Sequence, residues 1–405
     1  MILSLLTLAC IAFRPGLASD RILTNATDEY ERTLHALHQY RTLAAEDDGA
    51  VLSATEKPVE PGDYYDDVPL LVRLLTRVGD LPPAAVPDDL DLYQGALVEA
   101  VKRFQSRHGL EADGRIDTTT LEQLNTPLRV RVRQLELALQ RLRRRPYDPA
   151  RPLIVLNIPE FRLRAYGGTN AAGRDPELDM KVVVGAPEHR TPILVSQLKI
   201  VIFCPYWTVP VSIQRNELLP QIREDPSWVS ANHFELLTKL GVVAGSKTVS
   251  EHMLSELGAG ELLLRQKPGP KNTLGLVKFE FPNEYGVYMH DTSARWLFAQ
   301  ARRDLSHGCI RVEQPEDLAE WVLRGQAGWS RDRILSAMHG TKPISAKVKR
   351  PIQVVTTYST AVVMKNGEVH FFPDIYGEDA SLEKELAAQP HSMAISREPG
   401  QRPRE

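Results

Sequence analysis

One cysteine of this chain lies in a setting that suits a nucleophile, the run SHGCIRV at residues 306–312. A nucleophilic thiol needs a base or a positive field, because free cysteine has a pKa of about 8.5. It also needs donors for the oxyanion of a tetrahedral intermediate. Glycine permits unusual dihedrals and close approach of a substrate. The run therefore suits a nucleophilic Cys309, with the backbone amides of His307, Gly308 and Cys309 as oxyanion donors. Taken alone, the alternative is that Cys309 is a buried small hydrophobe.

The candidate base, His290, ends a predicted strand with the sequence YGVYMH. Side chains of a strand alternate between two faces, so Tyr288 and His290 share one face while Met289 and Asp291 share the other. Asp291 is therefore badly placed to orient the imidazole, and we predict that a backbone carbonyl does so. His290 is then expected to act as general base and later as general acid.

The remaining cysteines lack such a setting. Cys204, in VIFCPYW, has no glycine or histidine beside it and is typical of a buried small hydrophobe. Three cysteines also make no disulfide framework. His290 and His307 near one thiol raise the question of zinc, but no second cysteine or carboxylate has ligand spacing. We therefore expect neither a metal site nor a cofactor.

The chain has 405 residues, a length that suits two or three domains. Of these residues 42% are hydrophobic, as in an ordinary globular protein, and the net charge is −3. This charge provides no basic field for nucleic acid. Residues 1–19 contain an apolar run of signal-peptide length without a basic n-region. An export signal, a buried helix and a lipid anchor on Cys10 are the open interpretations.

The first part of the chain is predicted to be helical. Residues 20–66 are expected to form a partial N-terminal scaffold helix, at 28–45, and an acidic linker. Residues 67–127 have the pattern of a small three-helix module. Residues 128–150 predict a connecting helix with leucines inward and arginines outward, either simply solvated or in contact with an acidic polymer.

After Pro152 the pattern changes to short alternating strands, and residues 151–345 are predicted to form a mostly-β domain. A segment at about 212–269 contains helical stretches and is too long for a plain loop, which indicates an inserted cap. Residues 346–385 are predicted to form a C-terminal β hairpin and 386–405 a disordered tail. The expected fold class is α+β, a mostly-β domain with a helical capping insertion, preceded by a three-helix module.

Three stretches resemble one family of bacterial cell-wall enzymes. MHDT at 289–292, a gap, and SHGCIRV resemble the signature of the L,D-transpeptidases with a YkuD-type catalytic domain. Residues 100–125 resemble the helical peptidoglycan-binding module. The stretches YWTVPVSI and PGPKNTLGLVKF resemble the large subgroup whose catalytic domain has a capping subdomain. The N-terminal scaffold looks short for this subgroup, so we expect a truncated start.

The resemblance implies a two-step reaction without a cofactor. Cys309 would attack the carbonyl of the third residue of a tetrapeptide stem and release the terminal D-alanine, with His290 as the base. An amine of a second stem peptide would then resolve the thioester and form a 3→3 crosslink. Water as the resolving nucleophile would instead give an L,D-carboxypeptidase or amidase, and an inactive wall-binding protein is the third hypothesis.

Five residues are predicted to bind substrate. Arg311 would meet either a substrate carboxylate or a local structural partner, and both interpretations stay open. For Tyr288 and Ser306 two interpretations are open: they line the substrate site, or they only pack beside it. Trp207 either lines the cleft or belongs to the hydrophobic core. Asn272, in the stretch PGPKNTLG, is the fifth candidate.

The resemblance also implies a location and partners. The chain is expected to be exported to the periplasm or cell envelope, to help to determine cell shape, and to be a target of carbapenems. Its expected partners are peptidoglycan stem peptides, with an outer-membrane lipoprotein as a candidate acceptor. We expect no nucleic acid, and membrane contact only through the N-terminal signal. The helical module either binds peptidoglycan or is a spacer.

Overall fold

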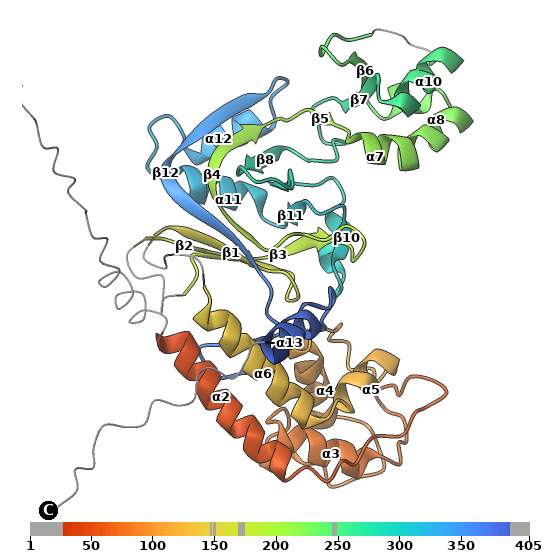
Figure 1. The fold of residues 1–405 in the computed structure, drawn as a ribbon. Coiled ribbons are helices and arrows are strands. Elements are labelled where there is room, and N and C mark those ends of the chain that lie inside the picture. The colour runs from red at the N-terminus through yellow and green to blue at the C-terminus, as the bar shows by residue number, and fades with distance from the viewer. Residues whose placement is uncertain (1–26, 146–147, 149–150, 169–174, 245–248, 389–405) are drawn as a thin grey trace, which may run out of the picture.

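The computed structural model describes residues 27–145, 148, 151–168, 175–244 and 249–388. The predicted signal segment at 1–19 and residues 389–405 of the predicted tail lie outside these ranges. The fold is α+β, with a β-rich part and its cap above and a helical part below (Figure 1). No helix in the described ranges is long and apolar enough to cross a membrane.

The β-rich part is built on one nine-stranded sheet with the order β10-β3-β11-β9-β8-β4-β12-β1-β2. Strand β3 also pairs with β2, which closes the sheet on itself and protects its edges. The strands are β1 (Leu153–Asn157), β2 (Arg162–Tyr166), β3 (Leu178–Gly185), β4 (Leu194–Phe203), β8 (Val277–Glu280), β9 (Met289–His290), β10 (Asp304–Ser306), β11 (Ile310–Val312) and β12 (Ile344–Thr357).

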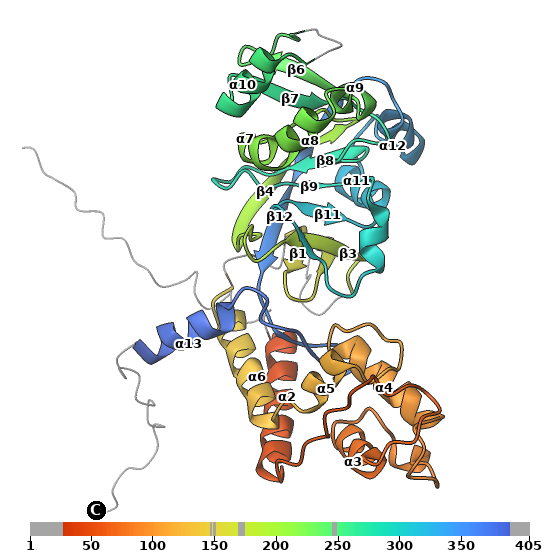
Figure 2. The same cartoon turned by 90° about the vertical axis from the view of Figure 1, so that its right-hand side faces the viewer.

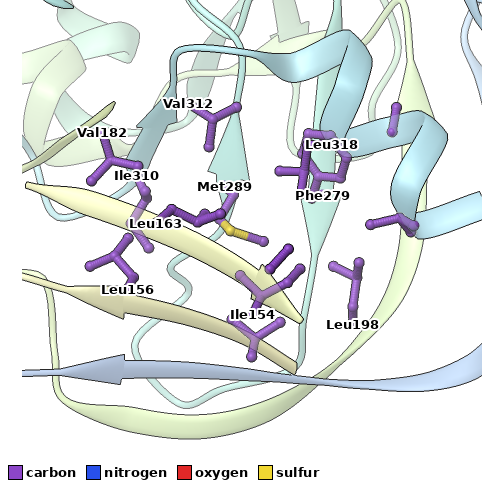
Figure 3. Packing of buried hydrophobic residues seen from close by; sticks show 14 of the residues in the cluster. Ile154, Leu156, Leu163, Val182, Leu198, Phe279, Met289, Ile310, Val312 and Leu318 are labelled. Atoms are coloured by element: carbon purple, nitrogen blue, oxygen red, sulfur yellow. The ribbon is translucent and has the colours of Figure 1, made fainter. Parts of the chain in front are cut away.

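Alternate side chains of these strands point inward and form the largest core cluster. Figure 3 shows Met289 of β9 and Ile310 of β11 side by side in this core, and both are fully buried. Helices α11 (Pro315–Leu323) and α12 (Arg331–Met338) add Trp321 and Met338 to the cluster. Because the inward positions are taken by apolar residues, the polar neighbours of Met289 and Ile310 must face the other side, where the chemistry lies.

The prediction of a hairpin over 346–385 is wrong at both ends. Helix α13 begins at Glu378 and continues to Ala388, into the first residues of the predicted disordered tail. Residues up to Thr357 belong to β12, which pairs in parallel with β1 and antiparallel with β4. Alternation predicts a strand but not its partner, and here the partners are distant in sequence. A short hairpin of β13 (Ala361–Val363) and β14 (Val369–Phe371) does form, and it packs in the helical part.

The capping insertion has its own core and lies at the top of Figure 1. Its helices were predicted, but it also contains a three-stranded sheet in the order β5-β7-β6. The first of these strands precedes the predicted start of the insertion. The cap elements are β5 (Trp207–Thr208), α7 (Val211–Ile213), the π-helix η2 (Gln214–Leu218), α8 (Leu219–Glu224), α9 (Trp228–Ala231), β6 (Phe234–Thr238), α10 (Glu251–Ala259) and β7 (Leu262–Gln266).

The helical part holds two cores, one inside the small module and one between α2, α6 and the hairpin. Figures 1 and 2 both show α2 and α6 side by side, with α13 close to α6. One arginine of α6, Arg131, is only 5% exposed, so the prediction that the arginines face outward fails there. The helices are α2 (Thr27–Ala45), α3 (Val68–Arg77), η1 (Pro83–Ala85), α4 (Ala96–Arg107), α5 (Thr118–Leu124), α6 (Leu128–Arg143) and α13 (Glu378–Ala388).

Candidate active site

Strand pairing brings the cysteine motif and the histidine together. Strands β11 and β9 run parallel, with Arg311 opposite His290. The Ile310 amide donates to the Tyr288 carbonyl at 3.0 Å, so Cys309 stands beside Tyr288. The sequence places these residues far apart along the chain, and the sheet register alone makes them neighbours.

The turn before β11 is braced by hydroxyl groups. The Ser306 hydroxyl donates to the Cys309 carbonyl at 2.6 Å and accepts from the Gly308 amide at 3.2 Å. The Thr191 hydroxyl donates to the Gly308 carbonyl at 2.9 Å. Gly308 has a φ of 101°, and a Cβ there would lie 3.3 Å from the Arg190 carbonyl oxygen. A side chain at this position would be strained by its backbone and crowded by its neighbour.

This bracing changes the expected oxyanion hole. The Gly308 amide, predicted as one of three donors, instead donates to Ser306. The amides of His307 and Cys309 form no hydrogen bond within the part of the chain that is described. Two backbone donors, not three, are therefore free to hold an oxyanion in this conformation.

His290 is arranged as a neutral base. Its ring is 3% exposed, and Nδ1 lies against the Asp291 carbonyl, which confirms the predicted backbone partner. A carbonyl only accepts, so Nδ1 carries the proton and Nε2 is the basic nitrogen. Burial and, to a lesser extent, the positive charges of Arg311 and Lys278 together lower the pKa of His290 to about 3, and the backbone hydrogen bond to Asp291 opposes them.

The Asp291 carboxylate takes no part in orienting this ring. It accepts from the Leu276 amide at 2.8 Å and pairs with Arg295 at 3.2 Å. It lies on the opposite face from His290, as strand alternation predicts.

Tyr288 links the thiol to the cap. Its ring centroid lies 5.7 Å from that of His290, and Lys278 Nζ lies 3.9 Å from the Tyr288 centroid. Burial raises the pKa of Tyr288, and the negative charge of the Cys309 thiolate adds to this. The Trp207 side chain, from β5, interacts with the Tyr288 hydroxyl. The structure therefore gathers the predicted residues Tyr288 and Trp207 beside the thiol.

The thiol itself is protonated at neutral pH. Burial raises the pKa of Cys309, and this outweighs the lowering by the amide and hydroxyl of Tyr288 and by the charges of Lys278 and Arg311. No hydrogen bond joins Cys309 to His290 among the described residues. The pair is thus a neutral thiol and a neutral imidazole, and the proton must move as the sulfur attacks.

Arg311 is a guanidinium without a local carboxylate. Its Nε is buried and has no hydrogen-bond partner. Within the described ranges it forms no ion pair, although a local structural pair was one of the two interpretations open for it. Burial lowers the pKa of Arg311, and the neighbouring Cys309 opposes this. An unpaired, half-buried cation beside the thiol suits a substrate anion.

A polar contact joins the cap to the cysteine turn. His307 Nε2 lies 2.7 Å from Glu217 Oε1, which belongs to the π-helix η2. The His307 ring also stacks on His189, with centroids 4.7 Å apart. Neither Glu217 nor Lys278 was predicted as a site residue, because both are ordinary surface types in the sequence. The packing of the cap brings Glu217 here, and the pairing of β8 with β9 places Lys278 opposite His290.

Asn272 is placed differently from the other candidates. It is buried, and its amide nitrogen donates to the carbonyls of Pro205 and Lys267 at 3.1 and 2.9 Å. Its oxygen accepts from the Leu274 amide at 2.8 Å. These bonds hold the loop between β7 and β8 at the base of the cap, and substrate contact by Asn272 stays a prediction.

The arrangement brings a thiol, a neutral imidazole and two free backbone amides together. The described residues contain no group of three or more His, Cys, Asp or Glu side chains able to hold a metal. Residues 151–351 match the family described as "L,D-transpeptidase catalytic domain". Residues 64–124 match that described as "Putative peptidoglycan binding domain". The chain therefore contains a catalytic domain of the L,D-transpeptidase family together with a peptidoglycan-binding-type domain.

Individual proteins are similar to parts of this chain. A "Putative L,D-transpeptidase" of Haemophilus influenzae is 32% identical over 231 residues, which is 56% of this chain and 45% of that protein. The chain thus spans less than half of that relative. The L,D-transpeptidase of Xylanimonas cellulosilytica is 15% identical over 75% of this chain and 100% of its own, with a TM-score of 0.23. L,D-transpeptidase 3 of Mycobacterium tuberculosis is 14% identical over 52% of this chain and 61% of its own, with a TM-score of 0.24.

Proposed function

We propose that this protein is an L,D-transpeptidase that forms 3→3 crosslinks in peptidoglycan through a thioester on Cys309. The observation that carries the proposal is the parallel pairing of β9 with β11, which sets a neutral His290 beside the cysteine turn. His290 Nε2 is the only ring nitrogen free to accept a proton, because Nδ1 is committed to the Asp291 carbonyl.

In the first step the Cys309 thiol gives its proton to His290 Nε2 while the sulfur attacks the carbonyl of the third stem residue. The amides of His307 and Cys309 hold the oxyanion. Collapse of the tetrahedral intermediate breaks the peptide bond, and the imidazolium returns its proton to the leaving amine of D-alanine. In the second step His290 deprotonates the acceptor amine, which attacks the thioester and releases Cys309.

Arg311 is proposed to bind a carboxylate of the donor peptide. The donor brings its terminal carboxylate and that of a diaminopimelate-type side chain close to the scissile bond. A guanidinium without an acidic partner matches such a carboxylate. The bound carboxylate would offset the free-energy cost of burying the unpaired Arg311 charge. Tyr288, Ser306 and Trp207 are proposed to shape the site around the donor.

Transfer to an amine is favoured over hydrolysis by the cap. The contact between Glu217 and His307 holds cap residues directly against the cysteine turn, which limits the access of water to the thioester. Hydrolysis by the same thiol is the alternative activity, and a wall-binding role without catalysis is the second.

A protein that acts on peptidoglycan works in the cell envelope. We propose the periplasm for this chain, with stem peptides as donors and either a second stem or an outer-membrane lipoprotein as the acceptor.

The test uses intact mass and product analysis. The wild type, Cys309→Ala and Cys204→Ala are incubated with a carbapenem, whose lactam mimics the acyl donor. We expect one adduct on the wild type and on Cys204→Ala, and none on Cys309→Ala. With a disaccharide-tetrapeptide, a crosslinked dimer would support transfer, whereas a tripeptide alone would support hydrolysis. No adduct on folded, reduced wild type would overturn the acyl-enzyme proposal.

A further inference from the structure

A cavity of about 360 Å³ lies in the helical part of the molecule and shares no residue with the site around Cys309. It is formed where α2, α4, α5 and α6 meet the β13–β14 hairpin, so its wall combines the peptidoglycan-binding-type module with the scaffold helices. Its walls include Tyr40, Phe104, His108, Arg131 and Phe371.

Arg131 brings a buried positive charge to this cavity. It is 5% exposed, and its Nη1 and Nη2 donate only to neutral acceptors, the side chain of Gln134 and the side chain and carbonyl of Gln123. Its guanidinium carbon lies 5.0 Å from the ring centroid of Phe371. Across the described ranges no carboxylate pairs with it. A buried charge without a counterion is costly, and proteins retain such a group chiefly where it meets an ion or ligand.

The start of helix α6 supplies a second positive element. Leu128 and Arg129, its first residues, line the same cavity. The N-cap residue is Pro127, which offers no capping side chain, and the first turn contains no acidic residue. The N-terminus of a helix has a partial positive charge and free N–H groups that bind anions. Arg131 stands one turn further along this helix, so both elements attract a negative group.

Two other arginines of the cavity wall are already balanced by carboxylates. Arg107 pairs with Asp80, and Arg77 pairs with Asp47 at 2.8 Å. Arg131 is therefore the buried charge left over, which matches a monoanion such as a carboxylate better than a dianionic phosphate. Arg129 is exposed and adds a second cation at the solvent side.

His108 gives the cavity a hydrogen-bond acceptor. The side chain is 2% exposed, and its Nδ1 donates to the Phe104 carbonyl at 2.7 Å. Burial, and then the charges of Arg131 and Arg107, hold the pKa of His108 well below its usual range. The ring is therefore neutral, and its Nε2 can accept an N–H. Leu74, Val78 and Leu124 make part of the remaining wall apolar.

We propose that this cavity binds the C-terminal carboxylate of a short peptide, with Arg131 and the start of α6 on the carboxylate and His108 on the adjacent amide N–H. The apolar wall would receive a small side chain. The group recognised is an acylated amino acid with a free carboxylate. Stem peptides of the wall end in such a group, and so do peptides of ordinary L-residues.

The probes are N-acetyl-D-alanine, N-acetyl-L-alanine and N-acetyl-D-alanine amide, titrated calorimetrically into the full chain. We expect the acids to bind and the amide, which lacks the charge, to bind at least ten-fold more weakly. A preference for the D-acid indicates a wall peptide, and equal binding of both acids indicates peptides in general. Equal binding of acid and amide, or no binding of any probe, would overturn the proposal.

Arg131→Gln and the control Arg133→Gln locate the site. Arg133 lies on the same helix, is partly exposed, and pairs with Glu136 and Glu383. Arg131→Gln should lose at least ten-fold in affinity for the acid, and Arg133→Gln should keep it. Arg131→Gln should also unfold at the same temperature as the wild type or higher, because it removes an unpaired buried charge. Unchanged affinity of Arg131→Gln for the N-acetyl acids would overturn the assignment of the site to Arg131. If that variant does not fold, the comparison of acid and amide binding to the wild type decides. Carbapenem acylation of Cys309 should be the same in both variants, so failure here is distinguishable from failure of the proposed function.

Discussion

The sheet holds two thiols at strand ends, and their surroundings differ completely. Cys204 directly follows β4, is 1% exposed, and donates from Sγ to the Gly340 carbonyl at 2.9 Å. Cys309 directly precedes β11 and is partly exposed beside Tyr288 and Arg311. Burial raises the pKa of both thiols. Burial therefore does not distinguish them, and the difference lies in the base, the hydroxyl and the free amides that the neighbouring strand and turn place around Cys309 alone.

The largest effect is expected from removing each thiol in turn. Cys309→Ala should abolish turnover of a tetrapeptide donor, because no other group of the site can form the acyl intermediate. Cys204→Ala should keep turnover within about two-fold and lose about 1 kcal/mol of unfolding free energy, since one buried hydrogen bond is lost. Donor consumption and chemical denaturation measure the two effects. Turnover that survives in Cys309→Ala would place the reaction elsewhere.

Removing the base should have the next largest effect. His290→Gln keeps the size and polarity of the side chain but cannot accept the thiol proton, so the acylation rate should fall by about 100-fold to 10,000-fold. His252→Gln, exposed on α10, is the control and should leave the rate unchanged. Stopped-flow acylation by a carbapenem measures both variants. A loss under about three-fold in His290→Gln would show that another group activates Cys309.

The same histidine should make stability depend on pH. The pKa of His290 is about 3 in the fold, against 6.5 for a free side chain. Between these values the unfolded chain binds the proton and the folded chain does not, so stability is complete above about pH 6.5 and is lost as the pH falls. Urea unfolding from pH 7 to pH 4 should show a weaker decline in His290→Gln. Identical declines would mean that the buried ring does not contribute.

Arg311→Gln tests whether the unpaired cation serves the substrate. We expect the kcat/KM for a carboxylate-bearing donor to fall by about ten-fold to a hundred-fold, with little change in thermal stability, because no local ion pair is broken. Arg324→Gln, whose guanidinium pairs with Glu177 at the surface, is the matched control. A destabilised variant with unchanged kcat/KM would make Arg311 a structural residue.

The smallest effect is expected at the cap. Glu217→Gln removes the carboxylate that contacts His307, and both side chains are partly exposed, so the direct energetic loss is small, about 1 kcal/mol or less. The ratio of hydrolysed to crosslinked product should rise by about two-fold to five-fold, since the cap would be held less firmly. Glu224→Gln on α8 is the control. An unchanged product ratio would show that this contact does not limit the access of water.

Much of the chemistry could be predicted from local patterns. Glycine beside Cys309 and a histidine at the end of a predicted strand suited a nucleophile and its base, because a nucleophile needs open backbone and a base whatever the fold. The reaction itself was implied by the resemblance of the spaced motif to the L,D-transpeptidases. Strand alternation also predicted that a backbone carbonyl, and not the Asp291 carboxylate, would orient the ring, and the structure shows that this carbonyl belongs to Asp291. These inferences rest on geometry within a few residues, which the chain determines directly.

Other features were decided only by tertiary structure. The commitment of the Gly308 amide to Ser306, the place of β12 in the sheet and the contact of Glu217 with His307 all depend on packing between distant segments. Arg131 was predicted to face solvent because a helical pattern shows which residues share a face but not which elements cover that face. By itself the sequence determined the candidate reacting groups and the strands beside them. The fold decided which backbone amides stay free, which charged side chains stay unpaired and which elements enclose them. The reason is that hydrogen bonds and charges are matched in space and not along the chain.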